Sequence, residues 1–226
     1  MATAEIVLDY IQTLVRPALI VFVVLRFRRG IADFMRRIAG ESREFSASAF
    51  GVGITAKFQE QLANLAEQSK TADPEQLRES VKRAAHDFGL DQFRALTSNF
   101  AELSLDARRE AAETLAEIAE TMELDDLVSF ADSGNVGERT GAAIGLGVQL
   151  QRDPSAARRD PKILEAVRKL LRDRSSLVRY RAVEAVRAVP ELAADVEDEL
   201  RSLAENDRNR HVRTMALKAL ARAGLQ

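Results

Sequence analysis

Few residues of this chain have the types and spacing that catalysis requires. The 226 residues include no cysteine and only two histidines, His86 and His211, far apart in the chain. This composition excludes a disulfide framework, thiolate zinc sites and a cysteine nucleophile, and it does not supply a histidine metal cluster. Carboxylates gather over residues 120–126, but such a run is typical of a solvated helix face. We therefore expect no enzymatic activity, no metal and no cofactor.

A glycine-rich motif, Gly51-x-Gly53-x-x-Ala56, formally matches the fingerprint of a dinucleotide-binding site. Such a site needs a sheet of several parallel strands, and no further strand pattern follows the motif. We interpret this match as chance.

The most distinctive polar group lies in an apolar stretch near the N-terminus. Residues 17–25 are an unbroken apolar run, and extension back to Ile6 gives twenty residues, the length of a bilayer span. That extension contains four polar residues on one helix face: Asp9, Gln12, Thr13 and Arg16. In one interpretation, several copies associate and this polar face lines a pore, or pairs Asp9 with Arg16 between helices. In the other, residues 4–16 lie at the outer interface and Arg16 reaches the head groups above a short span.

Basic residues follow the apolar run and set its orientation. No lysine or arginine precedes Arg16, whereas five arginines come directly after the run: Arg26, Arg28, Arg29, Arg36 and Arg37. The positive-inside rule predicts a single-pass protein of the cell (inner) membrane, with its N-terminus outside and its C-terminal domain cytoplasmic. Residues 1–43 thus comprise a transmembrane helix and a basic amphipathic helix against the inner leaflet. Residues 10–58 resemble the N-termini of uncharacterised bacterial membrane proteins, a resemblance that implies no activity.

Residues 44–58 alternate large and small side chains with a period of two, which predicts a strand-like linker. A single strand has no partner within the chain. We expect it to pair across subunits of a homo-oligomer, to form a tight hairpin or to lie extended. A helical interpretation stays open.

The pattern becomes helical from Thr55 onward. Residues 59–90 are predicted to form a capping helical hairpin, whose second helix begins at Asp73-Pro74 and ends at Gly89. Residues 91–226 follow with four predicted helical pairs. Their helices are Asp91–Leu103 with Leu105–Met122, Leu124–Asp132 with Val136–Gln151, Pro161–Asp173 with Ser176–Val189, and Pro190–Glu205 with Arg208–Ala223.

One pattern recurs in the second helix of each pair. An arginine is followed by a small residue three positions on, another near six, and an aliphatic residue at seven, starting from Arg108, Arg139, Arg179 and Arg213. The intervals are 31, 40 and 34 residues, and self-similarity of this size predicts a stacked helical array. The longest interval contains residues 151–160, which we expect to form a solvated loop.

The last two instances resemble the HEAT-type (PBS-lyase-like) repeat, whose second helix reads D-x-x-x-x-V-R-x-x-A-x-x-A-L. The match is complete from Asp207 to Leu220 and close from Asp173 to Val186, whereas Gly145 departs from it in the second pair. The resemblance implies an all-α fold, an α-solenoid of about four pairs after the membrane helix. The arginines and aspartates at the helix starts can pair across or within these units, and we expect such pairs to fix the register of stacking. The residues concerned are Asp173, Arg179, Asp207, Arg213 and Arg139.

The function that fits these features is a membrane-anchored scaffold or adaptor with a cytoplasmic protein-binding surface. A subunit of an oligomeric membrane assembly or pore is the alternative. Nucleic-acid binding by the basic C-terminal repeats is a third class. Residues 151–226 have a net charge of only +5 and residues 56–150 one of −9, which argues against nucleic acid as a partner.

Overall fold

The computed structural model describes residues 73–225, and every regular element in that range is a helix. The chain divides into two compact parts, residues 1–88 and residues 89–226. The predicted transmembrane and basic helices, the strand-like linker and the first helix of the capping hairpin lie outside the described residues. Within residues 73–225, no helix combines the length and the apolar character that crossing a bilayer requires.

Helix α3 (Pro74–Thr97) begins at the proline that the sequence predicted as a helix start. The predicted end at Gly89 is wrong, because α3 continues through this glycine for eight more residues. Gly89 does not have a positive φ, and its neighbours favour helix, so the cost of one interior glycine, about 1 kcal/mol, does not break the helix. The predicted helix Asp91–Leu103 is also corrected. Its residues form the end of α3 and the separate short helix η1 (Phe100–Glu102).

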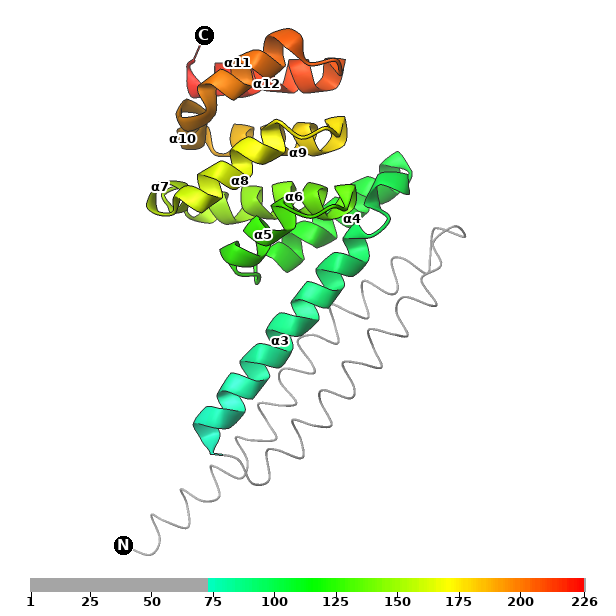
Figure 1. The fold of residues 1–226 in the computed structure, drawn as a ribbon, viewed down its shortest axis with the longest axis vertical. Coiled ribbons are helices and arrows are strands. Elements are labelled where there is room, and N and C mark those ends of the chain that lie inside the picture. The colour runs from blue at the N-terminus through cyan, green and yellow to red at the C-terminus, as the bar shows by residue number, and fades with distance from the viewer. Residues whose placement is uncertain (1–72, 226) are drawn as a thin grey trace, which may run out of the picture. The chain divides into compact units, whose positions relative to one another are not determined.

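The remaining helices all belong to residues 89–226. They are α4 (Leu105–Ala119), α5 (Leu124–Ala131), α6 (Val136–Arg152), α7 (Ala156–Arg159), α8 (Pro161–Leu171), α9 (Ser176–Ala188), α10 (Pro190–Ala193), η2 (Ala194–Val196), α11 (Glu197–Asn206) and α12 (Arg210–Ala223). The predicted helix Pro190–Glu205 is therefore three consecutive pieces. Figure 1 shows that the longer helices lie in layers.

Neighbouring helices pair along the chain, and the pairs stack in sequence order. Helix α5 packs on α6, α8 on α9, and α11 on α12. The second helices of the pairs form one continuous row, because α4 contacts α6, α6 contacts α9, and α9 contacts α12. Each layer is thus held mainly by the layers before and after it.

The pattern that follows each arginine forms the core of these layers. The small residue at the third position is buried in every case, as Ala111, Ala142, Ala182 and Ala216. The aliphatic residue at the seventh position is also buried, as Leu115, Leu146, Val186 and Leu220. Small side chains allow two helices to approach closely, and the aliphatic side chain fills the space between them.

Helix α6 lies close to its neighbours at four glycines. A Cβ atom at Gly137 would lie 1.7 Å from the carbonyl oxygen of Thr97 in α3. A Cβ at Gly141 would lie 2.6 Å from Thr97 Cγ2, and one at Gly145 would lie 2.5 Å from Leu127 Cδ2 in α5. On another face, a Cβ at Gly147 would lie 2.8 Å from the Cβ of Ala185 in α9. At Gly145, which departs from the alanine of the repeat pattern, an added Cβ would require the Leu127 side chain to move.

The predicted loop at residues 151–160 is partly helical. Its second half forms α7, in which Ala156 and Ala157 are buried. Asp160 then accepts a hydrogen bond from the backbone N–H of Lys162 and caps α8, which begins at a proline. The extra residues of the longest interval thus contribute to the core.

Candidate functional site

The recurring arginines bind the loops that precede their own helices. Arg139 Nη1 donates hydrogen bonds to the carbonyl oxygens of Ser133 and Gly134, at 2.9 and 3.1 Å. Arg179 Nη1 makes the same contacts with Asp173 and Arg174, at 2.8 and 3.0 Å. Each arginine therefore satisfies carbonyl groups in the turn between the two helices of its pair.

The other edge of the guanidinium reaches the next pair. Arg139 donates from Nε and Nη2 to the two carboxylate oxygens of Asp173, at 2.6 and 3.2 Å. Arg179 binds Asp207 in the same bidentate way, at 2.6 and 2.9 Å. All four side chains are mostly buried. We call each such contact a rung, and we call the residue six positions before each arginine the ladder position.

Each rung aspartate also organises the start of its own helix. Asp173 Oδ1 accepts a hydrogen bond from the backbone N–H of Ser175, and Asp207 Oδ1 accepts one from Asn209, both at 2.7 Å. The same carboxylate therefore shapes the turn before a helix and binds the preceding layer. Burial acts to raise the pKa of Asp207, but hydrogen bonds from Arg179 and Asn209 outweigh burial and hold this pKa below its ordinary value of 3.8.

The rung between α4 and α6 is missing. Ser133 occupies the ladder position there, and its hydroxyl accepts from the backbone N–H of Asn135, as the aspartates do in later pairs. Its side chain also hydrogen-bonds to Glu138 and does not reach Arg108. Arg108 instead donates from Nη2 to the carbonyl oxygen of Ala101 at 2.7 Å, and its buried Nε has no hydrogen-bond partner among the described residues.

A row of polar residues lies on the second helices α9 and α12 and does not continue onto α6. In α9, the helical period places Tyr180, Glu184 and Arg187 opposite the buried Ala182 and Val186, and all three are half-buried. Arg181, beside them, pairs with Glu184 at 2.7 Å and lies 6.0 Å from the centre of the Tyr180 ring.

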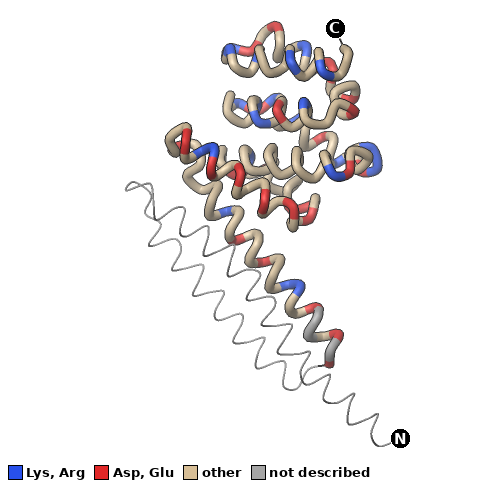
Figure 2. The backbone as a smooth tube through the Cα atoms, turned by 180° about the vertical axis from the view of Figure 1, so that it is seen from behind, with Lys and Arg blue, Asp and Glu red and all other residues tan. Residues whose placement is uncertain are grey.

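The equivalent residues of α12 are Thr214, Lys218 and Ala221, and they are exposed. Basic residues predominate on α9 and α12, whereas α5 has two acidic residues and no basic one (Figure 2). The row therefore presents mixed polar groups over two successive layers.

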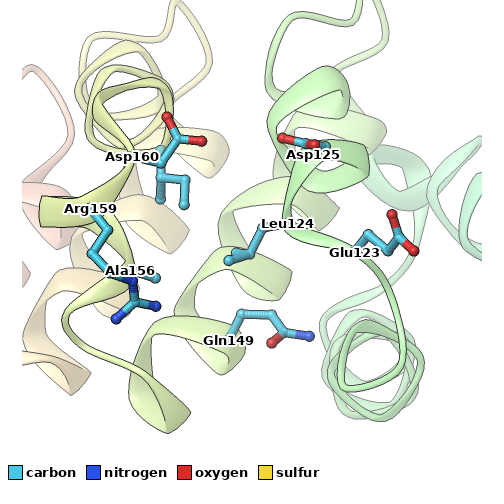
Figure 3. Close-up of a pocket in the computed structure, with 8 residues that line it drawn as sticks. Glu123, Leu124, Asp125, Gln149, Ala156, Arg159 and Asp160 are labelled. Atoms are coloured by element: carbon cyan, nitrogen blue, oxygen red, sulfur yellow. The ribbon is translucent and has the colours of Figure 1, made fainter.

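A shallow, open hollow of about 470 Å³ lies between α5, α6 and the segment from α7 to α8 (Figure 3). Three of its polar side chains have structural partners. Gln149 Nε2 donates to the carbonyl oxygens of Ala119 and Met122 at the end of α4, at 2.6 and 3.1 Å. Asp160 caps α8, and Arg159 is paired with Asp153. The hollow therefore shows no arrangement of an acid, a base and a nucleophile.

The pairing with Arg159 has a measurable consequence. Hydrogen bonds to Asp153, first from Arg159 and then from Ser155, lower the pKa of the Asp153 carboxyl from 3.8 to about 2. The substitution Arg159→Met is expected to raise this pKa toward 3.8, measured by the side-chain carboxyl shift in an NMR titration. Arg158→Met is the matched control, because Arg158 pairs with Asp195 instead, at 3.3 Å. An unchanged Asp153 pKa in the Arg159 variant would contradict this account.

The residues predicted as functional fall into three groups. Four of the five register residues form the two rungs, and Arg213 makes no ion pair with a described residue. The polar face (Asp9, Gln12, Thr13 and Arg16) and the basic group (Arg26, Arg28, Arg29, Arg36 and Arg37) lie outside the described residues. Among residues 73–225, no group of three or more acidic or histidine side chains could hold a metal ion.

Comparison with protein-family models, curated proteins and solved structures found no match to this chain.

Proposed function

We propose that this chain is a membrane-anchored, non-enzymatic scaffold built as an α-solenoid of HEAT-like helical pairs. The observation that carries the proposal is the repetition of one rung geometry. Arg139 with Asp173 and Arg179 with Asp207 join consecutive layers through the same donor atoms and the same carboxylate oxygens. Repeat proteins are stabilised by such contacts between nearest neighbours, and they bind partners along the extended surface that stacking creates.

The polar row on α9 and α12 is the surface that we assign to a protein partner. It combines an aromatic ring, an ion pair and exposed polar groups from two layers, among them Tyr180, Glu184 and Lys218. Tyrosine and arginine are enriched at protein interfaces because they offer a large contact area together with hydrogen bonds. The predicted span and its five arginines hold this surface at the inner leaflet, which raises its local concentration for membrane partners.

The proposal is tested by site-specific photo-cross-linking of the full chain in intact membranes. A photoreactive residue at Lys218, on the polar row, is expected to give adducts with another protein, whereas one at Lys162 is expected to give few. Lys162 is the matched control, because it is also an exposed lysine but lies on α8, which is the first helix of a pair and does not carry the polar row. Equal labelling from both positions would contradict the surface assignment, and release of the chain by alkaline carbonate would contradict the anchor.

A further inference from the structure

The two ends of the stacked row each carry one half of a rung. At the α12 end, Arg213 Nη1 donates to the carbonyl oxygen of Asp207 at 2.7 Å, as the earlier arginines do in their own loops. Its Nε and Nη2 edge has no carboxylate partner among the described residues. At the α4 end, the ladder position is Glu102, six residues before Arg108, and its side chain is exposed. Glu102 makes no ion pair with a described residue.

Apolar side chains mark the same two ends. Four residues after the arginine, α6 and α9 carry Ala143 and Val183, which are almost completely buried. The equivalent residue of α12 is Leu217, which is 57% exposed. At the other end, Leu105 in the first turn of α4 is 81% exposed. These two are the large apolar side chains that the described residues leave most open to solvent, and one lies on each end helix.

The charges of the end helices are opposite. Helix α12 contains four basic residues and no acidic one. Helix α4 contains four acidic residues, Asp106, Glu110, Glu113 and Glu117, against two arginines. Complementary charge of this kind directs two surfaces toward one another and disfavours contact between two like ends.

We propose that copies of this chain stack end to end, with Arg213 of one copy bound to Glu102 of the next. The contact continues the ladder, because it brings an arginine to a ladder-position carboxylate as in the two internal rungs. Leu217 is covered by the arriving copy, as the next layer covers Val183. The two surfaces differ, so the contact is heterologous and leaves a free end on each side, which allows short open chains of molecules to grow. This inference concerns the helical stack and does not depend on the membrane anchor.

Cross-linking distinguishes this arrangement from a symmetric dimer. The chain has no cysteine, so introduced thiols are unique. Ala101→Cys and Thr214→Cys place exposed thiols beside Glu102 and Arg213 and leave both charges intact. With a short bismaleimide, a mixture of the two full-length variants is expected to give a cross-linked dimer, and neither variant alone is expected to do so. Cross-linking within either variant alone, or none in the mixture, would overturn the proposal.

Charge reversal gives a second test, read by sedimentation of the full chain. Wild-type mass is expected to rise with concentration, and Glu102→Arg or Arg213→Glu alone is expected to weaken association at least tenfold. In an equimolar mixture of the two variants, both kinds of contact between unlike copies pair opposite charges, one as in the wild type and one with the charges exchanged, so association is expected to recover. Matched controls are Glu165→Arg and Lys162→Glu, exposed residues of α8 that are expected to associate like wild type.

Two further outcomes decide against the inference. A wild-type chain that stays monomeric at all concentrations would overturn it, and so would association that Arg213→Glu leaves unchanged. Because Arg213 also tethers its own loop, its reversal could unfold α12, which circular dichroism would reveal. Leu217→Asp preserves that tether and is expected to reduce association in the same way. Failure of Leu217→Asp to do so in a folded chain would likewise refute the contact.

Discussion

Replacement of Gly137 by alanine is expected to lower the free energy of unfolding by about 3 kcal/mol, near the upper end of overpacking costs in protein cores. In an isolated helix the same change would stabilise by about 1 kcal/mol, because glycine is a poor helix former. Here the new Cβ would lie 1.7 Å from the carbonyl oxygen of Thr97. That oxygen belongs to the backbone, so α3 or α6 has to move.

The control for this prediction is another helical glycine of the same chain. A Cβ at Gly89 would meet no atom within 4 Å, so Gly89→Ala is expected to stabilise by about 0.5–1 kcal/mol. Both values come from urea-induced unfolding of the full chain, followed by circular dichroism. If the two variants changed stability in the same direction, the close approach of α6 to α3 would not be the reason for glycine at position 137.

The substitution Asp207→Asn is expected to destabilise by about 3 kcal/mol, because it leaves the Arg179 guanidinium largely buried without its counter-charge. The Asp207 side chain is 2% exposed, and both of its oxygens bind Arg179. The matched control is Asp132→Asn, which removes the carboxylate that pairs with Lys169. Asp132 is 64% exposed, so that change is expected to cost less than about 1 kcal/mol.

The pH dependence of the same variant provides an independent check. The pKa of Asp207 is below 3.8 in the folded chain and close to 3.8 in the unfolded chain. Its stabilisation is therefore fully present above about pH 4 and is lost as the pH falls through the lowered pKa. The difference in unfolding free energy between wild type and Asp207→Asn is expected to shrink below pH 4. A constant difference from pH 6 to pH 3 would show that charge is not the source of the effect.

The helices that carry the arginine pattern could be predicted because the residues of each helix show by themselves which of its faces is buried. Alternation of small and aliphatic residues after Arg139 and Arg179 marks the buried face, and α6 and α9 begin at the residues predicted, Val136 and Ser176. Helix ends that depend on a single glycine could not be predicted. Gly89 costs α3 about 1 kcal/mol, and the rest of a 24-residue helix offsets that cost.

Contacts between layers could be predicted from the sequence only in part. Asp173 and Asp207 stand at a fixed distance before each arginine, which suggested pairing, but the sequence left open whether the pairs form within or between layers. The sequence did not show that the glycines of α6 lie at close contacts, because these contacts involve Thr97 and Leu127, which are distant in the chain. The burial of Ala156 in α7 was missed because the surrounding segment is rich in charge and contains a proline.

The presence of Ser133 at the ladder position affects the order in which the layers unfold. The boundary between α4 and α6 has no rung, and the glycines of α6 hold α6 to the layer before it by shape. The two later boundaries each have a carboxylate that serves both the turn and the rung. Acid therefore weakens the boundary between α9 and the α11–α12 pair, because protonation of Asp207 removes the counter-charge of Arg179. We expect backbone amides of α11 and α12 to exchange with solvent first below pH 4, while those of α6 stay protected, so that acidification opens the stack from its C-terminal end.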